Sequence, residues 1–227
     1  MRNLVEGVLR FEREALPQYG EKFAALAIGQ DPKVMFITCV DSRVVPNLIS
    51  AADPGELFVL RNVGNLLPTL GGSGLSTLDP GGPAAVYFAV KGLKVQDVVV
   101  CGHSGCGAMQ KHLERSKAPQ VSLGNPNLDV WLDQVDDSLK ELHNEGPLDD
   151  ALPEYDQLAQ VNVVQQLRRL QSYPFVRERL KDGSLRLHGW YFDIGTARVM
   201  EYAPNRRRFL PLAQGPLARS ILAGDEP

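Results

Sequence analysis

Apolar residues along this chain fall into short continuous runs that alternate with segments of helical periodicity. Runs rich in β-branched residues predict strands at 34–38, 57–61 and 95–101. Towards the carboxyl end, residues 185–194 predict a further strand, with 198–202 as its hairpin partner. Because strands that alternate with helices build parallel βαβ units, we predict an α/β fold with a mostly parallel central sheet flanked by helices.

Two helices are predicted ahead of the first strand. The first is expected to end at Pro17, because proline disfavours helical geometry in the residue before it, and a short second helix covers 21–28. Together they form an N-terminal helical arm, residues 1–30. The apolar face of the first helix carries Leu4, Val8 and Phe11.

The remainder of the chain alternates helices with loops. Further helices are predicted at 83–93, from 107 onward, and at 128–142, 158–170 and 175–180. Segment 71–83 is rich in glycine and proline and is expected to be a loop. No linker divides the chain, so we predict a single domain over 1–212, followed by a loose C-terminal tail over 213–227.

The composition is that of an ordinary soluble globule, with 44% hydrophobic and 22% charged residues among 227. A net charge of −3 favours no nucleic-acid or membrane-surface partner. No apolar run approaches the ~20 residues of a membrane span, and no signal peptide is predicted. Three cysteines without a CxxC pair indicate a reducing compartment. We expect a cytoplasmic location, with a carboxysome or another microcompartment as the alternative.

Two short segments carry candidate chemistry, and each follows a predicted strand. Cys39 ends the first strand, while His103 and Cys106 follow the third strand. Carboxyl ends of parallel strands meet at one edge of a sheet, so these side chains can meet if the two strands are close together. Two thiolates and one imidazole without a fourth protein ligand are typical of a catalytic zinc site that keeps one position open for water.

Asp41 and Arg43 lie next to the first of these residues. Arg43 can hold the Asp41 carboxylate in a bidentate pair, which keeps the carboxylate ionised and oriented beside the metal. Such a pair could also be only a surface ion bridge, which is common and weak. Because it stands two residues from a predicted zinc ligand, we favour a catalytic role.

Other chemistry-bearing residues have structural interpretations. A single cysteine at a strand end is usually a small buried hydrophobe, and we expect this of Cys101, because three ligands are already supplied. His112 and His143 are expected on solvent faces or at helix ends, with proton shuttling as the alternative. His188 lies within a predicted strand and is expected to be structural.

The segments CVDSR, at 39–43, and GHSGCGAM, at 102–109, resemble the β-class carbonic anhydrases. FVLRNVGN at 58–65, the segment 161–166, and LHGWYFDI at 187–194 are also similar to that family, especially to its plant-like and cyanobacterial members. The resemblance runs from the first helix to Tyr202.

The resemblance implies a zinc lyase that reversibly hydrates carbon dioxide to bicarbonate and a proton. It implies one Zn²⁺ per chain on Cys39, His103 and Cys106, with Asp41 and Arg43 as the catalytic dyad. It also implies a closed state, generally at lower pH, in which Asp41 leaves Arg43 and becomes a fourth zinc ligand.

The resemblance further implies a homodimer or a multiple of dimers, with a carbon dioxide pocket at the subunit interface. The matching positions are Gln30, Phe58 and Val63, together with Phe88, where many relatives carry tyrosine. Some relatives have a tryptophan three residues before the first cysteine, as part of a non-catalytic bicarbonate site. Phe36 stands there in this chain.

Two rival functions remain open from the sequence. One is an enzyme on the same scaffold that hydrolyses CS₂ or COS. The other is a non-catalytic scaffold protein whose fold zinc stabilises, although such a protein has no use for the Asp41–Arg43 pair.

Overall fold

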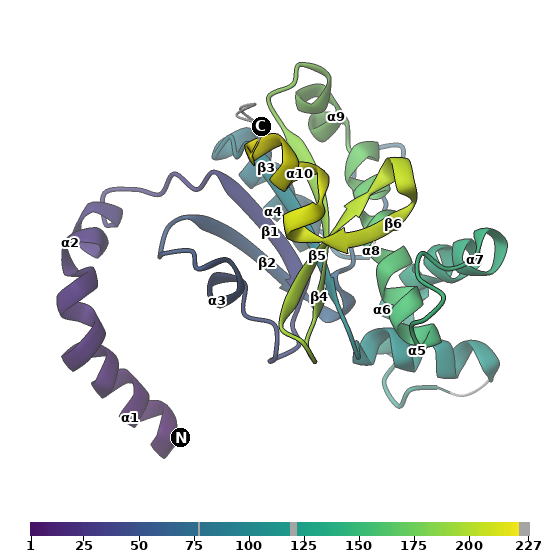
Figure 1. The fold of residues 1–227 in the computed structure, drawn as a ribbon, viewed down its shortest axis with the longest axis horizontal. Helices are drawn as coiled ribbons and strands as arrows, with labels where there is room; N and C mark the ends of the chain where they lie inside the picture. Colours follow the sequence, from purple (N-terminus) through teal and green to yellow (C-terminus); the bar gives the residue numbers. More distant parts are fainter. Residues whose placement is uncertain (77, 119–121, 223–227) are drawn as a thin grey trace.

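A computed structural model describes residues 1–76, 78–118 and 122–222 and shows one six-stranded sheet in the order β2-β1-β3-β4-β5-β6 (Figure 1). The strands are β1 (Val34–Cys39), β2 (Leu57–Asn62), β3 (Asp97–His103), β4 (Arg186–Asp193), β5 (Arg198–Ala203) and β6 (Arg208–Pro211). The first four pair in parallel, and β5 and β6 add antiparallel ladders at one edge. The predicted α/β fold with a mostly parallel sheet is therefore confirmed.

Strand neighbours decide where the candidate ligands lie. β1 runs beside β3, with Thr38 opposite Cys101, so their carboxyl ends share one edge of the sheet. β1 is apolar along nearly its whole length and is buried from Met35 to Cys39, as expected for a central strand covered on both faces. The sheet order therefore places the ends of β1 and β3 close together, which the sequence alone did not establish.

The N-terminal arm differs from its prediction. α1 (Arg2–Arg10), a π-helical turn (Phe11–Ala15) and α2 (Leu16–Leu26) form one continuous helical segment. Pro17 was expected to end the first helix, but it lies in the first turn of α2, directly after the π-helical turn. A proline has no N–H to donate and its ring crowds the preceding turn. The wider π-helical turn provides the local adjustment that lets the helix pass it.

α1 projects away from the body of the protomer (Figure 1), whereas α2 contacts the turn before β2, where Lys22 Nζ lies 2.7 Å from Asp53 Oδ2. Neither α1 nor α2 buries a single side chain within the protomer. The arm therefore gains little from packing against its own chain.

Eight further α-helices surround or extend the sheet in the described ranges. They are α3 (Pro46–Ser50), α4 (Gly81–Tyr87), α5 (Gly107–Lys117), α6 (Pro126–Leu132), α7 (Asp136–Glu145), α8 (Glu154–Ser172), α9 (Pro174–Lys181) and α10 (Pro216–Leu222). α3 was not predicted, because five residues are too short to show helical periodicity. The helix predicted over 128–142 is interrupted by a 3₁₀ turn at Asp133–Val135.

The carboxyl-terminal segment also departs from its prediction. A loose tail was expected from residue 213, but residues 216–222 form α10, while 223–227 lie outside the described residues. The buried carboxylate of Glu201 accepts a hydrogen bond from the Leu217 N–H at 3.0 Å and thereby docks the helix. Sequence periodicity could not reveal this tertiary bond.

α8 covers one face of the sheet and packs on β3 and β4. Its close approach depends on two glycines. A Cβ on Gly102 would lie 2.7 Å from Val163, and one on Gly189 would lie 3.0 Å from Leu167. A smaller aromatic cluster covers the opposite face, built on Phe36, Val44, Val99, Cys101 and Phe192. Cys101 is a packed core thiol, as predicted.

Candidate metal and catalytic site

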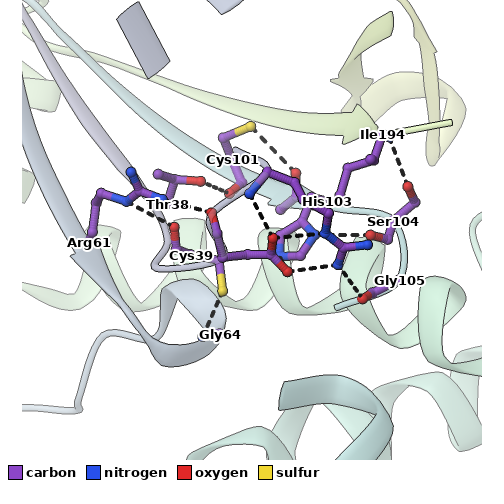
Figure 2. A network of polar contacts seen from close by, with 12 residues as sticks. Thr38, Cys39, Arg61, Gly64, Cys101, His103, Ser104, Gly105 and Ile194 are labelled. Atoms are coloured by element: carbon purple, nitrogen blue, oxygen red, sulfur yellow. Dashed lines mark hydrogen bonds and ion pairs between the residues drawn. The ribbon is translucent and has the colours of Figure 1, made fainter. Parts of the chain in front are cut away.

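Cys39, His103 and Cys106 meet at the carboxyl edge of the sheet, and Figure 2 shows Cys39 and His103 there. Cys39 ends β1, His103 ends β3, and Cys106 is the N-cap residue of α5. Their ligand atoms all lie within 4.8 Å of one another, and all three residues are buried. The structure thus brings together the complete predicted ligand set.

The ring of His103 presents one nitrogen to this group. Its Nδ1 lies 3.0 Å from the Ser104 carbonyl oxygen, which makes Nδ1 the donor. Its Nε2 is buried and has no hydrogen-bond partner in the described part of the chain. A buried acceptor nitrogen beside two sulfurs is the arrangement that a metal ion would satisfy.

The two buried sulfurs interact directly, and their pKa values move in opposite directions. The neighbouring Cys106 thiol and the Gly64 N–H, which lies 3.4 Å from Cys39 Sγ, outweigh burial and lower the pKa of Cys39. The Cys39 sulfur and burial together raise the pKa of Cys106. A divalent cation would favour both thiolates, and an S₂N donor set suits zinc.

Asp41 and Arg43 form the predicted bidentate pair beside the ligands. Arg43 Nε donates to Asp41 Oδ1 at 2.9 Å, and Nη2 donates to Oδ2 at 2.7 Å. The Arg43 hydrogen bonds hold the pKa of Asp41 well below its usual range. Asp41 Oδ2 lies 3.9 Å from His103 Nε2, so an ionised carboxylate borders the ligand group. The closed state, with Asp41 as a ligand, remains a prediction.

Arg61 fixes the first ligand loop from the neighbouring strand β2 (Figure 2). Its Nε donates to the Cys39 carbonyl oxygen at 3.2 Å, and its Nη2 donates to that of Asp41 at 2.8 Å. Sequence analysis missed this residue. Its only signal was an arginine within an otherwise apolar strand.

The second ligand loop is tied to β4. Ser104 N–H donates to the Phe192 carbonyl oxygen at 3.0 Å, and the Ser104 hydroxyl accepts from the Ile194 N–H at 2.9 Å. These bonds place His103 and the turn after it over the end of the sheet.

α8 supports the second ligand loop and the turn after β2 with polar side chains that the sequence analysis did not single out. Asp156 accepts a hydrogen bond from the Gly105 N–H at 2.6 Å. Asn162 donates to the Gly64 carbonyl oxygen at 3.1 Å, and Gly64 N–H in turn lies 3.4 Å from Cys39 Sγ. Gly64 has a φ of 79°, a conformation that favours glycine. A polar residue set between apolar ones, such as Asn162 between two valines, was the available signal.

The predicted substrate residues are partly assembled in one protomer. The rings of Phe58 and Phe88 lie 5.9 Å apart. Phe88 and Val63 remain 48% and 38% exposed, and Gln30 is exposed on the segment after α2. Their role in binding carbon dioxide stays a prediction.

The histidines outside the ligand group separate into two types. The expectation that His112 lies on a solvent face or at a helix end was wrong, because it is buried, with Nε2 3.2 Å from Asp136 Oδ1. His143 is exposed. His188 Nε2 lies 2.8 Å from Asp97 Oδ1 within the sheet, which fits its predicted structural role.

Across the described ranges, no helix has both the length and the apolar character needed to cross a bilayer.

Comparison with known proteins identifies relatives for the whole chain. A sequence model of the family described as "Carbonic anhydrase" matches residues 34–199. The carbonic anhydrase of Pseudomonas aeruginosa is 40% identical over 228 residues, which cover 100% of this chain and 98% of that protein. Carbonic anhydrase 1 of Escherichia coli O157:H7 is 38% identical over 222 residues, covering 97% of this chain and 96% of the relative.

Solved structures agree with these relatives. The β-carbonic anhydrase CcaA superposes with a TM-score of 0.81 at 33% identity, covering 93% of this chain and 91% of that one. A tetrameric β-carbonic anhydrase of the ascomycete Sordaria macrospora gives a TM-score of 0.73 at 30% identity, covering 89% of this chain and 96% of that one.

Proposed function

This chain belongs to the β-class carbonic anhydrases, and we propose that it interconverts carbon dioxide and bicarbonate with one zinc ion per chain. The supporting observation is the juxtaposition of two elements. A buried Cys39–His103–Cys106 group with an unpartnered imidazole nitrogen lies beside the ionised, Arg43-held carboxylate of Asp41.

When bound, zinc supplies the Lewis acidity that makes hydroxide available from water near neutral pH. Asp41 accepts a hydrogen bond from the water that enters beside the ligands, and so directs the oxygen lone pair at the carbon of CO₂. Arg43 keeps Asp41 ionised and fixed in orientation. The overall reaction adds one water to CO₂ and releases bicarbonate and a proton, which passes to buffer.

The proposed carbon dioxide pocket is formed by Gln30, Phe58, Val63 and Phe88. Phe58 and Phe88 already offer an apolar wall, and the exposure of Phe88 and Val63 in one protomer is consistent with a wall completed by a second copy. We therefore propose a homodimer or a multiple of dimers. The tetrameric Sordaria macrospora relative is consistent with this.

The free cysteines favour a reducing compartment. We propose a cytoplasmic location, either dispersed or within a carboxysome or another microcompartment.

Stopped-flow hydration of CO₂ by the zinc-loaded protein tests the proposed function. Rapid turnover that Asp41→Asn removes would support it. Zinc-loaded protein without CO₂ turnover would refute it and favour the scaffold alternative. Parallel assays with COS and CS₂ distinguish the other rival, which requires faster turnover of those substrates than of CO₂.

A further inference from the structure

Asp156 is a buried carboxylate that the proposed chemistry does not use. It lies in the first turn of α8 and is 7% exposed. No lysine or arginine of the described residues lies within ion-pair distance of it. Its Oδ1 accepts a 2.6 Å hydrogen bond from the Gly105 N–H. Burial of a carboxylate is costly, so this bond is the main local compensation that the structure offers.

Gly105 stands between two metal ligands, His103 and Cys106, and links Asp156 to the dyad. Its φ of +61° lies in the left-handed region, which few residues other than glycine adopt readily. While its N–H is held by Asp156, its carbonyl oxygen accepts a hydrogen bond from Arg43 Nη2 at 3.0 Å. The same Nη2 donates to Asp41 Oδ2 at 2.7 Å. One hydrogen-bonded path therefore runs from α8 to the Asp41 carboxylate.

Arg43 needs such an anchor because water reaches it. Its side chain is 49% exposed, whereas that of Asp41 is 16% exposed. A solvated arginine on a flexible stem gains little orientation from one ion pair alone. The Gly105 carbonyl provides a second fixed acceptor, so the guanidinium plane is set by two partners.

α8 is a suitable base for this anchor, because it is held against the sheet near Gly105. The Cβ position of Gly102 lies 2.7 Å from Val163 of α8, and Leu158 of the same helix is fully buried. A side chain on such a rigid helix holds its partner more accurately than one on a loop.

We infer that Asp156 is a positioning residue for the catalytic dyad. By holding the Gly105 backbone it fixes the carbonyl that anchors Arg43, and through Arg43 it sets the orientation of Asp41. The inference rests on the proposed function and adds to it a residue that touches neither substrate nor metal.

The test compares Asp156→Ala with Asp156→Asn. Alanine removes the acceptor, so kcat/KM for CO₂ hydration should fall roughly ten- to a hundredfold, as small misplacements of catalytic groups do. Asparagine keeps an acceptor oxygen for Gly105 and should recover most of the activity. Both variants should bind one zinc per chain by elemental analysis. Glu154→Ala is the matched control, because Glu154 is exposed in the same helical turn and pairs with the exposed Lys117. Its activity should equal that of the wild type.

Hydrogen exchange of the Gly105 amide supplies a readout independent of turnover. In the zinc-loaded protein this amide should be protected in the wild type and in Asp156→Asn, and should exchange faster in Asp156→Ala. A second readout is the double variant Asp156→Ala with Arg43→Ala. If Asp156 acts through Arg43, adding Asp156→Ala to Arg43→Ala should cost little further activity.

Three results would overturn the inference: full activity of Asp156→Ala, an equal loss from Asp156→Ala with and without Arg43, or an Asp156→Asn variant as impaired as Asp156→Ala. The last would mean that charge, rather than the hydrogen bond, matters. An inactive wild-type enzyme would instead refute the proposed function, so the two failures are distinguishable.

Discussion

At the scale of single residues, the site depends on which atoms remain without a proton or a partner. His103 donates from Nδ1 to a backbone carbonyl and so presents Nε2 to the sulfurs. Asp41 is kept ionised by three donors from Arg43, including its backbone N–H at 3.0 Å. Neighbouring groups therefore set the protonation state of the site before substrate arrives.

Cys106→Ser should lose most of its zinc and all measurable CO₂ hydration, because a neutral hydroxyl is a poor zinc ligand. The loss of zinc affinity should exceed the ~10–100-fold loss that is typical when a residue outside the ligand set is changed. Elemental analysis and stopped-flow assays measure both effects. Cys101→Ala is the control, since this core thiol is fully buried on the opposite face and should leave the zinc content unchanged. Full zinc occupancy in Cys106→Ser would contradict the ligand assignment.

Asp41→Asn should keep its zinc but lose CO₂ hydration by roughly 100-fold or more, the range of a positioned proton acceptor. The amide cannot form a charge pair with Arg43, and its NH₂ group faces the guanidinium unfavourably. Asp182→Asn is the control, because Asp182 caps a distant turn through Ser184. Near-normal turnover in Asp41→Asn would exclude the dyad.

At the scale of helices and strands, a second charged cluster joins β3 to β4 at the edge opposite the ligands. Asp97 accepts from Arg186 Nε at 2.7 Å and lies 2.8 Å from His188 Nε2. Burial alone would raise the pKa of Asp97, but these bonds outweigh burial and lower it to about 2. The cluster thus stabilises the start of the β3–β4 pair while Asp97 is ionised.

Asp97→Asn should lower the free energy of unfolding at pH 7 by about 2 kcal/mol, the worth of a pKa shift of this size. Because the folded pKa lies below the unfolded value of ~3.9, the stabilisation is present above that value and is lost as pH falls towards 2. The difference from wild type should therefore shrink between pH 4 and pH 2. Urea unfolding at several pH values measures it. Glu178→Gln is the control. Glu178 forms an exposed pair with Lys91, so this substitution should change the free energy of unfolding little. A difference independent of pH would disprove the ionic role.

The aromatic cluster on the sheet face opposite α8 leads to a prediction about inhibition by bicarbonate. Phe36 lies edge-on to Trp190 with ring centroids 5.9 Å apart, among the apolar residues Val44, Val99 and Phe192. A bicarbonate ion would lose its hydration there without a charged partner from this cluster. Added bicarbonate should therefore not switch the enzyme off beyond ordinary product inhibition. Initial rates at fixed pH and increasing bicarbonate measure this, and cooperative inhibition would contradict it.

Local patterns predicted the strands and the ligand loops, because apolar runs and motif spacing are short-range properties. Cys39, His103 and Cys106 were found in this way. The supports on α8 were not, since Asn162 bonds Gly64 across 98 residues of sequence. Pro17 and α10 were mispredicted for a similar reason. A π-helical turn accommodates the first, and a bond from buried Glu201 docks the second.

At the scale of the whole molecule, two apolar surfaces of the protomer lack a cover. The arm leaves Leu4 and Val8 of α1 and Phe11 of the π-helical turn 64%, 50% and 42% exposed. β2 lies at the open edge of the sheet, close in sequence to Val63, which is 38% exposed. Apolar faces of this kind mark association surfaces in soluble proteins. A second copy that covers both would explain why the arm extends from its own domain.

The wild-type chain should therefore sediment as a dimer or a multiple of dimers. Val8→Asp with Phe11→Asp should shift it towards monomers, because two carboxylates would then have to be buried in the interface. If the partner completes the pocket around Phe58, Val63 and Phe88, turnover per chain should fall with dissociation and recover at higher protein concentration. Arg13→Asp is the control, since it places the same carboxylate at an exposed polar position of the arm. Analytical ultracentrifugation and stopped-flow assays at matched concentrations measure the two effects. A wild-type monomer with full activity would show that one protomer holds a complete site, and that the arm serves another purpose.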